Sequence, residues 1–494
     1  MSAAHRPHAP RARHLALASL ASLASLALAC QGAQSGDRES ARSEAAAPTG
    51  VVAPSGAPAP TAPPPPPAIA AAPAESAAMG GEAGGGPSSG AAKPADAAPP
   101  AMKMKKEMAR EAEAMDEEIA APDPAKPRPD FDRNVQAGLL TAGAFDDLKN
   151  PTVLERFLAE FAQRSDFGQL VGAFTGARMV VTVQDEKARP LGDAEVTFTD
   201  AKGTVRTLRS RSDGKVVHVS PHDGDAPVKV SVRHGSAAVE RAFKDPVPES
   251  LIFLPGASAA LPSSLDLLLV IDATGSMSDE IEYLKVELRS IAQSIAEAHP
   301  QVDQRYGLVV YRDRGDDYLT RRFDFTSSLE DFIKTLGEQS AGGGGDYPEA
   351  MEAALADAEG LSWRKGNVAR VSFLIADAPP HIEHYGATLG SVERLREKGV
   401  VIYPIAASGA ASEAEIFMRI AAMLTGAVYI FLTDDSGVGN SHVEPHIPCY
   451  FVERLSGVMS RVLQDELAGT RSDPDPSRVI RTVGAPKGGV CTRQ

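Results

Sequence analysis

Aromatic and basic residues are scarce in this sequence. Only 5% of its 494 residues are aromatic although 43% are hydrophobic, and Gly and Pro occur 43 and 38 times. This composition is typical of a chain whose N-terminal part is rich in Ala, Pro and Gly and whose C-terminal part has the composition of an ordinary globular protein. Lys and Arg number 50 against 65 Asp and Glu, so the formal net charge is -15. Because phosphate binding needs clustered Lys and Arg, this balance argues against nucleic acid as a partner and indicates plain solubility.

Cysteine is also rare, and the first of the three cysteines follows a segment with the parts of an export signal. Residues 1–29 contain basic residues, then an apolar stretch too short for a durable membrane span, then small residues. Leu26-Ala-Leu-Ala-Cys30 resembles a bacterial lipobox, with Ala27 where Leu is usual. The resemblance implies cleavage before Cys30 and acylation of its thiol. An ordinary secretory signal with an incidental cysteine is the alternative.

The other two cysteines, Cys449 and Cys491, are a candidate disulfide pair. Export would bring them into an oxidising compartment in which they can bond. Such a bridge would tie the C-terminal tail onto the last helix. Sequence alone specifies a bridge weakly, so two unpaired thiols remain the alternative.

The chain between the signal and the first strands is expected to hold little core. Residues 30–129 are a low-complexity mixture of Ala, Pro and Gly that cannot bury enough apolar surface to offset its ordering entropy. We expect a disordered tether between an anchored N-terminus and the folded body. Residues 130–175 predict a short helical segment, because the stretch from Pro151 to Phe161 carries an apolar face at helical spacing. That face is expected to pack against a neighbouring domain.

Residues 176–258 change to a period of two. Short alternating runs at 179–183, 194–198, 216–219 and 228–232 are separated by turn residues, which predicts a small β-sandwich. The pattern resembles the carboxypeptidase-regulatory-like sandwich of secreted proteins. It contains no cluster of chemical groups, so we expect a spacer or an adhesive module.

Residues 263–469 alternate strand and helix patterns. This alternation predicts an α/β fold, a doubly wound and mostly parallel sheet with helices on both faces. Phe323-Asp-Phe325 is a candidate antiparallel edge. Residues 470–494 are expected to form an irregular tail. The parallel strands are expected near residues 265–272, 306–312, 369–376, 400–406 and 427–432.

Oxygen-bearing side chains follow the first of these strands. The apolar run from Leu267 to Ile271 predicts a buried parallel strand, and Asp272, Thr274 and Ser276 come after it at alternate positions. Open α/β sheets bind their ligands at the carboxyl ends of the strands. One carboxylate and two hydroxyls at this point therefore predict a cradle for a divalent cation.

Two further segments complete a family pattern. Residues 342–349 read Gly-Gly-Gly-Gly-Asp-Tyr-Pro-Glu, and residues 373–381 read Phe-Leu-Ile-Ala-Asp-Ala-Pro-Pro-His. Together with Asp-x-Thr-x-Ser at 272–276, they resemble the von Willebrand factor type A domain and its metal-ion-dependent adhesion site. The resemblance covers about 200 residues, a usual domain size. Thr274 stands for the family's first Ser and keeps the hydroxyl, whereas Asp346 stands where the family's second loop carries Thr.

The resemblance implies a site for Mg²⁺, which takes six oxygen ligands and usually keeps some waters. Ser276 and Thr274 would bind the ion directly, while Asp272 and Asp377 would act largely through bound water. One position would remain for an acidic side chain of a protein partner. Mn²⁺ suits the same oxygens, and Ca²⁺ is favoured if Asp346 adds its charge. The sequence leaves open whether Asp346 binds directly, through water, or only caps the following helix.

Other chemistry has little support in the sequence. His381-x-Glu383-His384 matches no zinc pattern and is expected to be a loop at the rim of the site. Residues 342–345 lack the Lys-Ser/Thr of a phosphate loop. Ser276 has no evident His partner for serine hydrolysis.

The sequence thus predicts an exported, lipid-anchored bacterial protein, not an enzyme, that binds another protein or a surface through a metal-bridged carboxylate. Gln31 after Cys30 is not the Asp that marks inner-membrane retention in enteric bacteria, so an outer-membrane anchor facing the periplasm or the surface is favoured. One alternative is a structural subunit of a cell-envelope complex whose A domain binds metal only for stability. Another is a metal-assisted hydrolase, although no general base is placed beside the ion.

Overall fold

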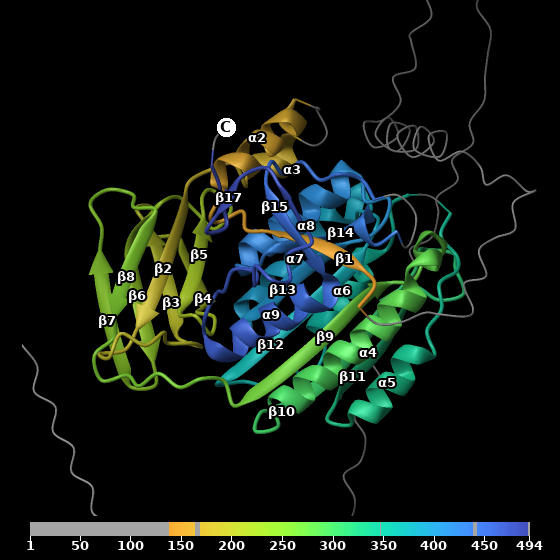
Figure 1. Ribbon diagram of the computed structural model, residues 1–494. Helices are drawn as coiled ribbons and strands as arrows, with labels where there is room; N and C mark the ends of the chain where they lie inside the picture. Colours follow the sequence, from red (N-terminus) through yellow and green to blue (C-terminus); the bar gives the residue numbers. More distant parts are fainter. Residues whose placement is uncertain (1–137, 164–167, 346, 438–441, 493–494) are drawn as a thin grey trace, which may run out of the picture. The chain divides into compact units, whose positions relative to one another are not determined.

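The computed structural model describes residues 138–163, 168–345, 347–437 and 442–492. They form a nine-stranded mixed sheet with helices on both faces and, between its first and second strands in sequence, a β-sandwich (Figure 1). The expected α/β fold with a mostly parallel central sheet is confirmed. The predicted signal peptide, Cys30 and the tether lie outside the described residues. Within the described ranges, no helix is both long and apolar enough to cross a membrane.

The order of strands in the central sheet creates a point at which the chain changes direction. Five neighbouring strands run parallel, in the order β10-β9-β12-β13-β14, so the first strand of this set lies between the second and the third. Connections therefore leave β9 and β12 in opposite directions, and α/β proteins bind ligands at such a switch point. Strand β11 is the expected antiparallel edge. The strands are β1 (Thr141–Phe145), β9 (Ser264–Asp272), β10 (Asp303–Tyr311), β11 (Thr320–Thr326), β12 (Val368–Ala376), β13 (Val400–Ala406), β14 (Tyr429–Thr433), β15 (Tyr450–Arg454) and β16 (Arg481–Val483).

Helices cover both faces of this sheet. Helices α4, α5 and α9 pack together on one face, and α6, α7 and α8 on the other (Figure 1). Burial from both sides explains why Leu267 to Ile271 in β9 is apolar throughout, with every side chain at most 3% exposed. The helices are α4 (Ile281–Ala298), α5 (Leu329–Gly337), α6 (Met351–Glu359), α7 (Tyr385–Glu397), α8 (Ser412–Thr425) and α9 (Leu455–Ala468).

The segment expected to be only helical begins with a strand of the central sheet. Strand β1 lies between β14 and β15 and runs antiparallel to both. Gly143 is required there by close packing, because a Cβ atom would lie 2.4 Å from the Phe431 ring and 3.0 Å from the Tyr450 ring. The expected helix follows as α2 (Pro151–Ala162), which buries its apolar face, and then α3 (Gly168–Gly172).

The sandwich consists of a three-stranded sheet, β5-β2-β8, and a four-stranded sheet, β4-β3-β6-β7. Strands β2 and β3 bury every second residue, as the period of two predicts. Side chains from both sheets, including Val181 and Phe198, share one apolar core. The strands are β2 (Arg178–Gln184), β3 (Glu195–Asp200), β4 (Val205–Arg209), β5 (Lys215–Val219), β6 (Pro227–His234), β7 (Ala237–Ala242) and β8 (Glu249–Phe253).

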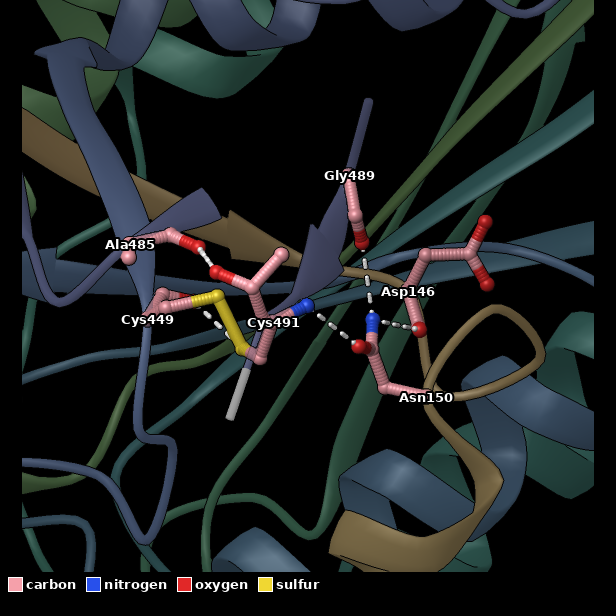
Figure 2. The surroundings of a disulfide bond; sticks show 7 residues. Asp146, Asn150, Cys449, Ala485, Gly489 and Cys491 are labelled. Atoms are coloured by element: carbon pink, nitrogen blue, oxygen red, sulfur yellow. Dashed lines mark hydrogen bonds between the residues drawn. A yellow bond between two sulfur atoms is a disulfide. The ribbon is translucent and has the colours of Figure 1, made fainter. Parts of the chain in front are cut away.

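The C-terminal tail is more regular than expected. Strand β16 pairs with β15, and β17 (Pro486–Lys487) pairs with β18 (Val490–Cys491). A disulfide joins Cys449 to Cys491, and so holds the tail to the residue before β15 rather than to the last helix (Figure 2). The Asn150 side chain donates to the carbonyls of Asp146 and Gly489 at 2.9 and 2.8 Å and accepts from the Cys491 N–H at 2.8 Å. The tail is thus also held to the turn before α2.

Candidate metal site

The first predicted loop lies at the switch point of the sheet. Asp272 ends β9 and is fully buried, and the backbone N–H and hydroxyl of Thr274 donate to its Oδ1 at 3.0 and 2.7 Å. The Thr274 hydroxyl lies 3.2 Å from that of Ser276. Asp272 Oδ2 has no hydrogen-bond partner among the described residues. The two hydroxyls and this free oxygen therefore lie together, as the alternate spacing predicts.

Glycines bring the second loop against the first. The N–H of Gly342 donates to the carbonyl of Ala273 at 3.0 Å, and the N–H of Gly275 donates to the carbonyl of Gly343 at 3.0 Å. Gly344 has a φ of +78°, and a Cβ atom on it would lie 3.3 Å from Thr274 Cβ. A larger residue would push the two loops apart. Asp346, the predicted ligand of this loop, lies outside the described residues.

The third loop supplies Asp377, the residue after β12. Its side chain is 4% exposed, and its Oδ1 has no hydrogen-bond partner in the described part of the chain. Strand β12 pairs with β9 up to Ile375 opposite Ile271, so Asp377 comes next to Asp272. Burial and then the charge of Asp272 raise the pKa of Asp377 well above its usual range. Burial raises the pKa of Asp272 to about 6, although its hydrogen bonds from Thr274 oppose the shift.

The structure adds Glu349, which the sequence analysis did not assign. Its backbone N–H donates to the Pro379 carbonyl at 3.1 Å, so the second loop is joined to the third. The side chain is 4% exposed, and its Oε2 has no described hydrogen-bond partner. Burial and the charges of Asp272, Asp313 and Asp377 raise the pKa of Glu349 to about 10. The available signal was an acid closing the motif at 342–349, but an acid just before a helix is ordinarily explained by the helix dipole.

These carboxylates lack compensating cations. In the described ranges, no Lys or Arg nitrogen lies within 4.0 Å of an oxygen of Asp272, Glu349 or Asp377. The neighbouring Arg312 instead donates to the carbonyls of Ala273 and Ser340 at 3.1 and 3.0 Å. Because a buried carboxylate without a cation is costly, the loops have the charge of a site that binds one.

His381 connects two loops at the rim of the site. His381 Nε2 lies 2.7 Å from Asp313 Oδ1, and both side chains are buried. Asp316 in the same loop accepts from the N–H groups of Asp313 and Gly344 at 3.0 and 2.8 Å. His381 thus holds the loop after β10 against the loop after β12.

A serine, a histidine and an aspartate meet beside α4 without forming a nucleophile. His442 Nδ1 lies 2.7 Å from Asp434 Oδ1, and its Nε2 lies 3.2 Å from the Ser408 hydroxyl. The buried Glu280, however, accepts the Ser408 hydroxyl proton and lies 2.9 Å from the same Nε2. The histidine cannot take the serine proton while Glu280 accepts it, so this arrangement fixes a loop onto the N-terminus of α4.

His222, Asp223 and Glu393 are the one group of three potential ligands whose atoms lie within 4.8 Å of one another among the described histidines, cysteines and carboxylates. Arginines already bind this group. Arg396 donates to both oxygens of Asp223 at 2.8 and 2.9 Å and to Glu393 at 3.0 Å, and Arg206 pairs with both. The group is therefore an ion-pair network between the sandwich and α7.

The three loops at the switch point fit a hard dication better than any other group. Every donor there is an oxygen, which is the ligand type of Mg²⁺, Mn²⁺ and Ca²⁺. Three buried oxygens, from Asp272, Glu349 and Asp377, have no described partner. Because no three carboxylates of these loops approach within 4.8 Å of one another in the described set, the hydroxyls and water must supply part of the coordination.

Part of the chain is similar to known proteins. Residues 266–429 match the family model described as von Willebrand factor A domain. An alpha-protein kinase of Dictyostelium discoideum is 34% identical over 124 residues, which are 24% of this chain and 19% of the kinase. This chain spans 19% and 11% of the length of the two curated relatives that it matches.

Two solved structures are also similar. The conserved hypothetical protein BatB from Bacteroides thetaiotaomicron has 12% identity and a TM-score of 0.27, with 41% of this chain and 97% of that chain covered. The pilus adhesin SpaC from Lactobacillus rhamnosus GG has 11% identity and a TM-score of 0.30, with 49% and 32% covered. From the family model and the sheet that surrounds the site, we conclude that residues 266–429 belong to a von Willebrand factor A domain.

Proposed function

We propose that this protein binds a divalent cation at the loops after β9 and β12 and uses it to hold a protein partner. A protein-interaction role is what the A domain supports. The metal is Mg²⁺, with Mn²⁺ and Ca²⁺ as ions that suit the same oxygens. When bound, the cation would accept an oxygen ligand from the partner.

One observation carries this proposal. Asp272, Thr274 and Ser276 follow β9 and Asp377 follows β12, and these two strands are paired neighbours at the sheet's switch point, so the fold brings the oxygens of both loops together. Buried carboxylates with no described cationic partner need positive charge, and a dication supplies it.

The residues of the proposed site have different roles. Ser276 is exposed and Thr274 is buried, so the Ser276 hydroxyl lies at the surface that a partner can reach. Asp272 orients Thr274 through two hydrogen bonds. Tyr347 donates to the Asp377 carbonyl at 3.2 Å and accepts from the Ala411 N–H at 2.7 Å, and so holds the second and third loops in register.

The finer parts of the proposal concern the partner and the location. We infer that the partner presents an acidic side chain to the cation, and that the protein is exported and anchored through a lipid on Cys30, in the outer membrane. Asp346 is proposed to add charge beside the ion. The sequence motifs support these points.

Calorimetric titration of the full chain with Mg²⁺ tests the metal site. We expect one binding event that Ser276→Ala weakens by about tenfold or more, because the variant loses an inner oxygen ligand, while Ser327→Ala, an exposed serine before α5, leaves it unchanged. Absence of heat and of any shift in melting temperature for the wild type would refute metal binding.

A pull-down from surface extracts tests what the metal does. The wild type in Mg²⁺ should retain a partner that is released by EDTA and is not retained by Ser276→Ala. If the partner stays bound in EDTA while the melting temperature falls, the metal serves stability alone, as expected for a structural subunit of an envelope complex.

A further inference from the structure

Glu349 is a buried carboxylate close to the proposed ligands. A Cβ atom on Gly344 would lie 3.0 Å from Glu349 Oε1 and 3.3 Å from Thr274 Cβ, so the carboxylate lies beside Thr274 across this glycine. The backbone of Glu349 pairs in a parallel bridge with Pro380, three residues after Asp377. Its position is therefore set by the same loops that form the site.

A role as an ordinary acid at the start of a helix does not explain this side chain. Glu352, in the first turn of α6, pairs with Arg314 at 2.6 Å. Glu349 has no Lys or Arg within 4.0 Å among the described residues, and its Oε2 has no hydrogen-bond partner there. An exposed helix start would leave such an acid in water, yet this one is 4% exposed.

The charges at the site restrict what else can bind. Asp272, Asp377 and Glu349 carry three negative charges when ionised, against the two positive charges of one dication, and Asp346 is proposed to add a further negative charge. A partner's carboxylate would add one more. Like charges that close together disfavour each other's ionised form. A site with this much negative charge therefore accommodates Glu349 or an incoming carboxylate beside the ion, and not both.

On the basis of the proposed metal site, we propose that the Glu349 side chain occupies the coordination position that a partner's carboxylate would take. Glu349 is then an internal ligand that keeps the metal site closed. A partner with an acidic side chain binds by displacing it, and its affinity is reduced by the free energy of that displacement.

Titration with Mn²⁺, followed by water-proton relaxation, measures both affinity and the number of waters on the ion. We expect Glu349→Ala in the full chain to bind Mn²⁺ about tenfold more weakly than the wild type, and with higher relaxivity because a water takes the vacated position. Acetate should lower the relaxivity of this variant toward that of the wild type and leave the wild type unchanged.

Glu383→Gln, which alters an exposed acid on the rim, is the matched control and should behave as the wild type. Glu349→Gln keeps the side-chain volume and tests the same point if the alanine variant is unstable, because its neutral amide should also weaken Mn²⁺ binding. Wild-type affinity and hydration in both Glu349 variants, with binding lost in Ser276→Ala, would overturn this proposal and leave the metal site intact. No Mn²⁺ binding by the wild type would overturn the metal site itself.

Discussion

Arg419 is one of the largest side chains that the described part of the protein buries completely. It donates to both oxygens of Asp147 at 3.0 and 2.7 Å and to Glu415 at 2.9 Å, and its guanidinium carbon lies 4.9 Å from the centre of the Phe157 ring. These contacts join the turn before α2 to α8. Burial raises the pKa of Asp147, although Arg419 opposes the shift.

Removing one partner of this pair should destabilise the protein strongly. We expect Arg419→Met or Asp147→Asn to lower the free energy of unfolding by about 3 to 5 kcal/mol, because the remaining polar group stays buried without its partner. The double variant Asp147→Leu/Arg419→Met should lose less than the sum of the single losses. Urea denaturation measures both, with the exposed Arg289→Met as control. Single losses under about 1 kcal/mol would show that the pair is dispensable.

The residues of a site can be predicted from the sequence when they come directly after a strand that the sequence itself indicates. Asp272, Thr274 and Ser276 could be predicted because they follow a wholly apolar strand at alternate positions. Glu349 could not, since its burial depends on a bridge to Pro380, a residue far away in the sequence. The Ser408 and His442 contacts to Glu280 depend on tertiary structure in the same way.

Among the elements, β1 is one whose conformation could not be predicted from the sequence. Its residues, Thr-Ala-Gly-Ala-Phe, show no alternation, and their extended conformation comes from pairing with β14 and β15. Strands such as β9 and β12 were predictable because long apolar runs between helical patterns favour buried parallel strands. Strands β16 to β18 were not, because they are short and their pairing depends on contacts with β15 and the disulfide.

The close packing of β1 gives a test at this scale. Gly143→Ala should destabilise the protein by about 1 to 3 kcal/mol, because the added methyl group overlaps the Phe431 ring, which must move. Gly337→Ala at the end of α5, where a Cβ meets nothing within 4 Å, is the control and should cost little. Thermal denaturation of the two variants side by side decides the matter, and equal melting temperatures would contradict the packing argument.

Cutting the disulfide should free the tail. In a simple chain-entropy model, a bridge between residues 42 apart stabilises a protein by about 4 kcal/mol. We therefore expect Cys491→Ser to lower the free energy of unfolding by up to about this amount, and to expose residues 481–491 to proteolysis before the rest of the chain. Limited proteolysis with mass spectrometry follows the tail, and unchanged protection there would show that Asn150 and β16 suffice to hold it.

At the scale of the whole molecule, charged pairs join the sandwich to the A domain. Arg396 of α7 binds Asp223, which lies between β5 and β6 of the sandwich, and Arg206 of β4 binds Glu397 at 2.6 Å. Burial alone would raise the pKa of Asp223, but the charge and hydrogen bonds of Arg396 overcome it and lower the pKa to about 2.

This lowered pKa predicts a loss of stability in acid. An unfolded Asp has a pKa of about 3.9, so the contribution of Asp223 is fully present above about pH 4 and is lost as the pH falls toward 2. The difference in free energy of unfolding between the wild type and Asp223→Asn should therefore shrink over that range. Asp225→Asn, which removes an exposed partner of Lys202, should show little pH dependence. A difference that is constant from pH 5 to pH 2 would exclude this role for Asp223.

The position of β1 bears on how the A domain can be isolated. A shortened protein beginning at residue 263 would lack the strand that pairs with both β14 and β15. Two rows of backbone N–H and C=O groups would then face water, and such edges readily pair with another copy of the chain. A fragment that begins at residue 263 would thus be prone to aggregate, whereas one that retains residues 138–492 would keep every described pairing of the sheet.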